Sequence, residues 1–303
     1  MLEKLKNLIF DEYKRQEINI RTQSESVHYV SPLIELSEEQ REILEKGDGQ
    51  KLNEYKQINS STGLAVNYYK LMEDLDLISE LIFEKKPAIP LEKSQKFVNI
   101  DVFYKRNGTL YFVESKFLEP YYNGNEVLVD AYFDENRYPI EIQAFHNEWH
   151  QLFLQSKDFQ YYDVAQLCRH LLALYRYTHG YEGSEYQGEP VVLQSVTWEM
   201  PEHFINLLSS PSDRDKMRER VEALKEEAKR CHDMFNTLIN EIDWNNMTFE
   251  TLHYNDMLDE IKSNEHYRDF CKRYFFLIRQ KSAPHTFARE CRGAVFLCCS
   301  VWR

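Results

Sequence analysis

The chain has 303 residues, of which 43% are hydrophobic, 14% aromatic and 29% charged, and its formal net charge is −13. This apolar content can fill a core, which excludes a disordered or fibrous protein. Nine glycines and nine prolines are too few for a collagen-like or linker-rich architecture. The acidic balance argues against a surface that wraps nucleic acid, but it leaves open a local basic patch or a site that gathers metal cations.

The sequence contains no sign of a membrane span or of secretion. No run approaches the roughly eighteen consecutive apolar residues of a membrane helix. The first residues, MLEKLKNLIFDEYKRQE, lack the apolar stretch and small-residue cleavage site of a secretory signal. We therefore expect a cytoplasmic protein whose six cysteines, which show no CxxC and no zinc-binding spacing, are reduced thiols.

The N-terminal part of the chain predicts helices. Residues 1–59 read as a polar, helical extension of the domain. In the next stretch, SSTGLAVNYYKLMEDLDLISELIF, apolar residues recur at steps of three and four, which predicts a long amphipathic helix over 61–84 that begins at Ser60 or Ser61. Pro87 and Pro90 forbid its continuation, and an early strand is expected near 84–93.

Between residues 97 and 118 the apolar period changes to two. The stretch FVNIDVFYKRNGTLYFVESKFL contains two β-rich runs around Asn107-Gly108, the strongest short-range signal of a hairpin. If these two residues form the turn, the numbers of opposed residues sum to 215, so Asp101 faces Glu114. Lys116 lies two residues beyond Glu114 and shares its face, while the other face is apolar.

The remaining segments suggest a mixed α/β sheet with helices on it. An aromatic-rich segment covers 119–160, a helix is expected over 162–178, and a buried strand over 190–198. The domain would thus have a core at 60–200 and a helical C-terminal region at 201–303 packed on it.

A heptad-like seam runs along the expected helix 214–241. It has two interpretations, packing onto the protein's own body, which we favour, or a homodimer through this helix. The seam residues are Met217, Val221, Leu224, Ala228, Cys231, Phe235 and Leu238.

The hairpin carries the candidate chemistry. Directly opposed like charges destabilise a sheet, so a purely structural role would favour another residue beside Asp101. Two adjacent carboxylates can, however, hold a hard cation such as Mg²⁺, or Mn²⁺, and an ammonium nearby can orient a water or face a phosphate. Asp101, Glu114 and Lys116 therefore form a minimal apparatus for metal-assisted phosphodiester hydrolysis.

Asp101, twelve intervening residues and then Glu114-Ser115-Lys116 resemble the PD-(D/E)XK nuclease superfamily, the restriction-endonuclease-like fold. The expected order of elements is similar to that family's α-β-β-β-α-β core, and the resemblance covers about 140 residues. SSTGLAVNYY followed by AQLCRHLLAL also looks like uncharacterised bacterial families of this superfamily. The sequence departs from the pattern at Asn99-Ile100, which precede Asp101 where the family name implies a proline.

The resemblance implies a role for each residue of the motif. Asp101 and Glu114 would be metal ligands with the backbone carbonyl of Ser115 as a third, Lys116 would be the catalytic lysine, and Gln166 would lie near the active site. The first helix of such enzymes often donates a further acidic ligand. The candidates are Glu73, Glu80 and Glu84, with Asn67 as another unresolved possibility.

Each of these assignments has a structural alternative. The bare spacing of the three hairpin residues is a weak signal, and the alternative is a solvated sheet face. Gln166 equally fits a polar helix boundary, and His170, which could approach a phosphate, is at least as often a structural histidine. The tyrosines of 119–162 could stack on bases of a splayed strand, but we favour their covering the sheet edge.

The sequence thus favours a Mg²⁺-dependent endonuclease that acts on DNA. One alternative is a non-catalytic binding or interaction protein that keeps the nuclease fold, since fold alone does not establish chemistry. Another is a metal-dependent hydrolase of small phosphate compounds, which would use the same three residues.

Overall fold

A computed structural model describes residues 1–24, 27–46, 54–87, 98–122, 128, 130–138, 140–180 and 186–276. The C-terminal tail and part of the strand expected near 84–93 lie outside these residues. The three cysteines within them, Cys168, Cys231 and Cys271, are free and buried, in agreement with the expected reduced thiols. No helix among the described residues is long and apolar enough to cross a membrane.

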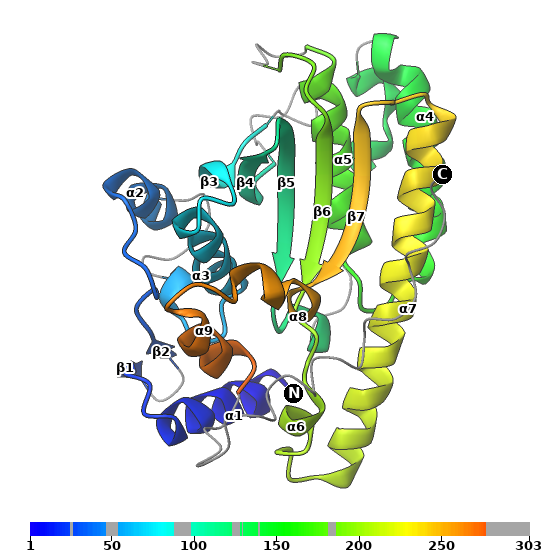
Figure 1. Cartoon of the computed structure of the whole chain (residues 1–303). Coiled ribbons are helices and arrows are strands. Elements are labelled where there is room, and N and C mark those ends of the chain that lie inside the picture. Colours follow the sequence, from blue (N-terminus) through cyan, green and yellow to red (C-terminus); the bar gives the residue numbers. More distant parts are fainter. Residues whose placement is uncertain are drawn as a thin grey trace, which may run out of the picture.

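A mixed five-stranded sheet forms the centre of the molecule (Figure 1). Its strands are adjacent in chain order, the first three antiparallel and the last three parallel. They are β3 (Ser79–Lys85), β4 (Ile100–Arg106), β5 (Thr109–Lys116), β6 (Val191–Thr197) and β7 (Met247–His253). This confirms the expected α/β class, and β4, β5 and β6 are the hairpin and the buried strand that the sequence predicts.

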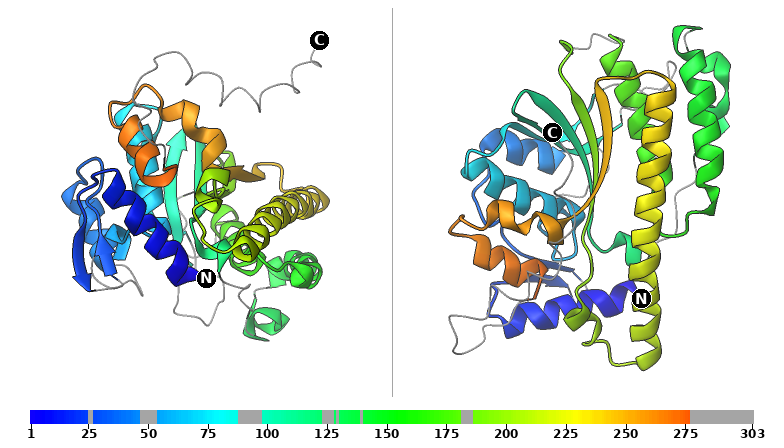
Figure 2. Two further views of the ribbon diagram at one scale, coloured as in Figure 1. Left: turned by 90° about the horizontal axis from the view of Figure 1, so that it is seen from below. Right: turned by 45° about the vertical axis from the view of Figure 1, so that its right-hand side comes forward.

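Helices cover both faces of the sheet, as the right-hand view of Figure 2 shows. One face, through Tyr104, packs on α3, and the other, through Phe112, packs on α5. The helices α7 and α4 complete the layer beside α5, while α8 and α9 lie on the side of α3. Their bounds are α3 (Ser61–Asp74), α4 (Ile140–Gln155), α5 (Val164–Thr178), α7 (Pro211–Glu241), α8 (Tyr254–Met257) and α9 (Tyr267–Tyr274).

The turn between β4 and β5 sets the register on which the site depends. Asn107 and Gly108 both have positive φ, 52° and 79°, as a two-residue type I′ turn requires. The observed pairs, from Arg106 with Thr109 to Val102 with Val113, have numbers that sum to 215. The predicted register is therefore confirmed.

The expected helix 61–84 is wrong beyond residue 74. Asp76 adopts a left-handed conformation with φ of 53°, and the amide of Leu77 bonds back to the carbonyl of Met72. This is the hydrogen bonding of a Schellman motif, which closes the helix C-terminus. The chain then enters β3, so Glu80 and Glu84 lie on a strand and not on the first helix.

The regions that flank the predicted core are not wholly helical. The N-terminal region contains α1 (Leu2–Arg15), a two-stranded sheet of β1 (Arg21–Ser24) and β2 (Val27–Tyr29), and α2 (Glu38–Lys46). The C-terminal region contributes β7, whose parallel pairing with β6 gives it a place in the central sheet. The boundaries near residues 59 and 200 stay predictions.

The seam on α7 faces the protein's own body. Its seven residues, Met217 to Leu238, are all buried, and α7 packs on β7 and α4. A short α6 (Glu202–Ile205) contacts the same helix. The favoured interpretation agrees with this packing, while a homodimer through this helix stays a prediction.

Candidate active site

The hairpin brings Asp101 and Glu114 to neighbouring positions of β4 and β5. The observed pairing ends with Val102 and Val113, and Asp101 and Glu114 are the next residues beyond this pair on the two strands. The Oδ2 atom of Asp101 accepts the backbone N–H of Ser115 at 2.8 Å. This bond holds the Asp101 carboxylate beside the strand that carries Glu114.

Glu114 is buried between a cation and an imidazole. Its side chain is 2% exposed, with Oε1 2.8 Å from Lys116 Nζ and Oε2 2.7 Å from Nε2 of His170, which is 1% exposed. The Nδ1 atom of His170 has no hydrogen-bond partner within the described part of the chain, so a neutral ring would donate its proton from Nε2. Burial by itself raises the pKa of Glu114, but Lys116 and His170 outweigh it and lower that pKa to about 2.

Lys116 is held by two hydrogen-bond acceptors, on β5 and α5, and by a carboxylate at the N-cap of α5. Besides Glu114, its Nζ donates to Oε1 of Gln166 at 2.6 Å and lies 3.7 Å from Oδ2 of Asp163. Burial by itself lowers the pKa of Lys116, but attraction to the surrounding carboxylates, first Glu114 and then Asp163, outweighs it and raises the pKa above the usual value. The side chain is therefore a fixed ammonium at neutral pH.

Asp101 has the opposite electrostatic environment from Glu114. Burial first, and then the negative charges of Glu114 and Glu84, hold the pKa of Asp101 well above its usual value, against smaller opposing effects of Lys116 and the Ser115 N–H. Its negative charge is thus under-compensated by the protein's own groups, which is the condition that a bound cation relieves.

The donor set fits a hard divalent cation. Mg²⁺ takes oxygen ligands, keeps several waters and needs only one or two carboxylates from a protein. Asp101, Glu114 and the carbonyl of Ser115 supply oxygens only. Among the described residues no three Asp, Glu, His or Cys side chains converge into a metal-binding group, so waters or substrate oxygens would complete the coordination.

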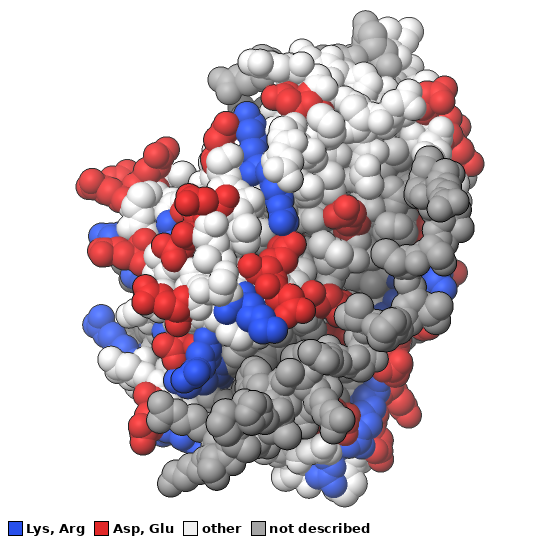
Figure 3. All heavy atoms as spheres, viewed as in Figure 1, with Lys and Arg blue, Asp and Glu red and all other residues white. Residues whose placement is uncertain are grey.

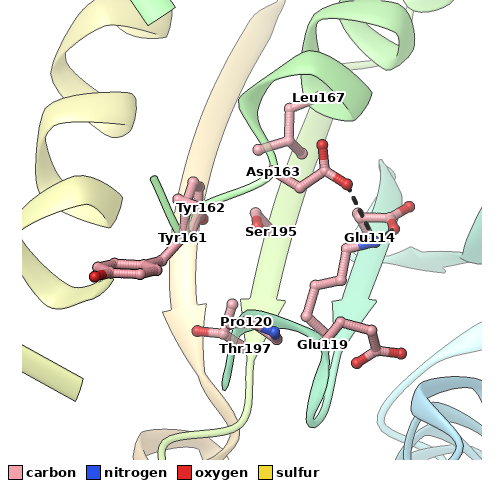
Figure 4. Close-up of a pocket in the computed structure, with 10 residues that line it drawn as sticks. Glu114, Glu119, Pro120, Tyr161, Tyr162, Asp163, Leu167, Ser195 and Thr197 are labelled. Atoms are coloured by element: carbon pink, nitrogen blue, oxygen red, sulfur yellow. Dashed lines mark ion pairs between the residues drawn. The ribbon is translucent and has the colours of Figure 1, made fainter. Parts of the chain in front are cut away.

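A pocket of about 180 Å³ opens beside Lys116, on the side of β6 (Figure 4). Glu114 and Lys116 form one wall, while Ser195 and Thr197 line it from β6. The remaining lining residues are Glu119, Pro120, Tyr161, Tyr162, Asp163 and Leu167. The two site residues of β5 therefore border a space that a small group can enter.

A comparison with known protein families assigns the chain to one of them. A family model described as Restriction Endonuclease associating with ARP, abbreviated REase-ARP, matches residues 7–275. The chain belongs to this family. Comparisons with curated proteins and with solved structures found no match. The REase-ARP match confirms the restriction-endonuclease-like family that the motif suggested, and it covers the flanking regions as well as the core.

The structure separates the candidates for a further acidic ligand in this REase-ARP chain. Glu73 forms an ion pair with Lys70, and Glu80 forms one with Lys105 at 3.1 Å. Glu84 lies on β3 next to Asp101, because Phe83 pairs with Val102 and Lys85 with Ile100.

Asn67 is a structural residue. It is buried, accepts the Leu33 N–H and donates to the carbonyl of Gly63. Of the three acidic candidates, Glu73, Glu80 and Glu84, the last is thus nearest to Asp101.

Some site residues were missed or were placed differently by the sequence. Asp163, which caps α5 by accepting the Gln166 N–H, reaches Lys116, and its position before an apolar helical run was the available signal. His170, considered for a phosphate, instead contacts Glu114.

Among the aromatic residues in and just after the segment 119–160, Tyr121, Trp149 and Tyr162 are buried in the core, while Tyr122, Tyr132 and Tyr161 are partly buried. Tyr121 donates to the carbonyl of Trp198, and Trp149 donates to that of Cys168. Tyr161 differs, since it lines the pocket with the Arg220 guanidinium 4.3 Å from its ring centroid.

Proposed function

We propose that this protein is a divalent-metal-dependent nuclease that hydrolyses phosphodiester bonds, with DNA as its substrate. The observation that carries the proposal is the position of Asp101 next to Glu114, with Lys116 2.8 Å from Glu114 on the same strand. Two carboxylates held close together cost stability, and one of them, Glu114, borders a pocket, which favours a functional role.

Each residue has a stated task in this proposal. Asp101, Glu114 and the Ser115 carbonyl would hold Mg²⁺ or Mn²⁺. Such an ion, when bound, stabilises charge on a phosphoryl oxygen and lowers the pKa of an attached water. Lys116, kept as an ammonium by its neighbours, donates hydrogen bonds to the attacking water or to a phosphate oxygen, and Gln166 fixes its direction.

The raised pKa of Lys116 also limits its role. A group that stays protonated at neutral pH cannot take the proton of the attacking water. Lys116 thus acts by position and charge, and the proton of the water leaves to another acceptor.

The burial of the site favours catalysis over the non-catalytic alternative. A solvated salt-bridge cluster needs no buried member, whereas Glu114 is 2% exposed and borders a pocket. The family description names an association with ARP, and we propose that such a partner accompanies cleavage and does not replace it.

The proposal is tested with purified protein, plasmid and labelled oligonucleotides, with Mg²⁺, Mn²⁺ or a chelator. Asp101→Asn, Glu114→Gln and Lys116→Met should each lower the cleavage rate by about 10²-fold or more while a cooperative thermal transition persists. The matched control is Lys105→Met, which removes an ion-paired lysine at the far end of the same hairpin.

Undiminished cleavage by all three variants rejects the assignment. Hydrolysis of nucleotides without cleavage of plasmid or oligonucleotides would identify the small-phosphate hydrolase instead. Loss of cleavage in Lys105→Met as well would mean that the hairpin as a whole, and not its acidic end, is required.

A further inference from the structure

We propose that the pocket beside Lys116 receives a nucleobase that carries an exocyclic amino group, turned out of its stack next to the phosphodiester bond that is cut. This inference rests on the proposed nuclease function and adds to it the chemistry by which the substrate is selected. Four properties of the pocket lead to it, namely position, size, walls and charge.

The position of the pocket suits the nucleoside next to the reacting phosphate. Neighbouring strands lie about 4.8 Å apart, so Asp101 on β4 and Ser195 on β6 flank Glu114 from opposite sides. Glu114, a proposed metal ligand, and Lys116 both line the pocket, which extends to Ser195 and Thr197 on β6 (Figure 4). A phosphate held at Lys116 would therefore have its own nucleoside within reach of the pocket.

The size of the pocket suits a small planar group. Its volume of about 180 Å³ is several times the ~30 Å³ that a water occupies in the liquid. It is smaller than the roughly 300–1,000 Å³ of pockets for larger ligands and cofactors. The volume of a nucleobase, a planar group of about ten heavy atoms, lies between these two volumes.

The walls of the pocket combine flat apolar surfaces with hydroxyl groups. Pro120, Tyr162 and Leu167 supply apolar surface, and Tyr161, whose ring carries the Arg220 guanidinium on one face, is the aromatic group that can stack on a base. Ser195 supplies a buried hydroxyl from β6. Enzymes that act on extruded bases read them through this combination of stacking and polar contacts.

The acidic side chains that line the pocket select among bases. Glu119 and Asp163 line it, and each carboxylate is fixed by a backbone N–H, from Phe117 at 2.9 Å and from Gln166 at 3.1 Å. Ionised carboxylates only accept hydrogen bonds. Cytosine offers an amino donor where thymine offers a carbonyl acceptor, so the pocket favours cytosine over thymine.

Binding of single-stranded oligonucleotides tests the inference without cleavage. Fluorescence anisotropy with Ca²⁺ in place of Mg²⁺ compares oligo(dC) with oligo(dT) of equal length, two unstructured pyrimidine strands. We expect oligo(dC) to bind about tenfold more tightly. Ser195→Val, which adds a branched side chain on the pocket side of β6, should remove the difference.

Two further variants keep the result decisive. Thr248→Val, at an exposed position of β7, is the matched control and should keep the full preference. If Ser195→Val fails to fold, Glu119→Gln replaces it, since an amide donates to thymine O4 and should narrow the preference.

Equal binding of the two strands by the wild-type protein, or a full preference in the pocket variants, overturns the inference. Cleavage without any preference would reject the pocket and keep the nuclease. A preference without cleavage in any metal would reject the nuclease and keep the pocket as a base-binding site.

Discussion

Asp101 and Glu114 occupy neighbouring positions, yet the fold shifts their pKa values in opposite directions. Glu114 is ionised in the folded state down to a pKa of about 2, so it stabilises the fold at neutral pH and loses this contribution as the pH falls from about 4.5 toward 2. Asp101 has a raised pKa, so its preference for the folded state is largest when it is protonated and is lost as the pH rises above about 4.

The first residue-scale prediction concerns stability without metal. Asp101→Asn should raise the free energy of unfolding at pH 7 by about 1 kcal/mol, since one pKa unit corresponds to about 1.4 kcal/mol and partial exposure reduces the effect. The new amide oxygen can still accept the Ser115 N–H. Urea denaturation in a chelator measures this, and the gain should vanish below about pH 4, where Asp101 is protonated in both states.

Divalent cations should reverse the order of stability of the wild-type protein and the Asp101→Asn variant. Added Mn²⁺ should raise the melting temperature of the wild-type protein and leave Asp101→Asn unchanged, because only the former keeps both carboxylates. A variant that is less stable than wild type in the chelator would contradict this account of Asp101.

The second residue-scale prediction concerns His170. His170→Ala removes a buried hydrogen bond to Glu114 and should lower the free energy of unfolding by about 2 kcal/mol. The pKa of Glu114 should rise toward its ordinary value, so the stability lost between about pH 4.5 and pH 2 should be smaller than in the wild type. His179→Ala, at the exposed C-terminus of the same helix, is the control and should change neither quantity appreciably.

At the scale of single residues, the sequence predicts how the two strands pair but not which side chains surround the two carboxylates. An Asn-Gly turn fixes the register of the two strands next to it, so the pairs from Arg106 with Thr109 to Val102 with Val113, just before Asp101 and Glu114, follow from counting. The contact of His170 with Glu114 depends on how α5 lies across the sheet, which no local pattern specifies.

Among the elements, the β4–β5 hairpin makes the clearest prediction. Gly108 has φ of +79°, and a Cβ added there would meet nothing within 4 Å, so the cost of a side chain comes from the backbone alone. Gly108→Ala should lower the free energy of unfolding by about 1 kcal/mol and retain cleavage. Asn107→Gly, which eases the other left-handed position, is the matched comparison, and a destabilisation larger than that of Gly108→Ala would contradict the assigned turn.

The sequence misplaces two elements, the end of α3 and the strand β7, for two different physical reasons. Leu75 and Ile78 continue the helical spacing of α3, and the stop is an aspartate, whereas glycine or asparagine is the usual residue in the left-handed cap. The short strand β7 follows a 31-residue helix and gains its place only by pairing with β6. The end of α3 is therefore a local feature at a residue that rarely marks one, whereas β7 depends on a contact with a distant part of the chain.

For the whole molecule, the acidic balance bears on how nucleic acid is bound. On the face seen in Figure 3, the described acidic and basic residues are interspersed, and no continuous basic surface crosses it. With 50 acidic against 37 basic residues, few phosphates can be neutralised at once. We therefore expect log Kd for DNA to change with log salt concentration by a slope of about 2 or less, compared with the roughly 5 to 9 of proteins that contact six to ten phosphates.

Binding titrations from 50 to 300 mM salt measure this slope with the Asp101→Asn variant, which cannot cut the probe. A steep slope would require a continuous basic surface on the opposite face. DNA binding would then depend mainly on ionic contacts with phosphates. A shallow slope agrees with recognition confined to the neighbourhood of Lys116.

Because β7 lies near the C-terminal end of the described chain, it is synthesised late, and this affects folding during synthesis. Strand β6, buried along its whole length, receives its second neighbour only after residue 253 has been synthesised. Until then one edge of an apolar strand offers unpaired amides and carbonyls, a template for other chains. Fragments that stop before residue 247 should therefore collect in inclusion bodies, so that a ribosome which halts early yields no soluble, partly folded product.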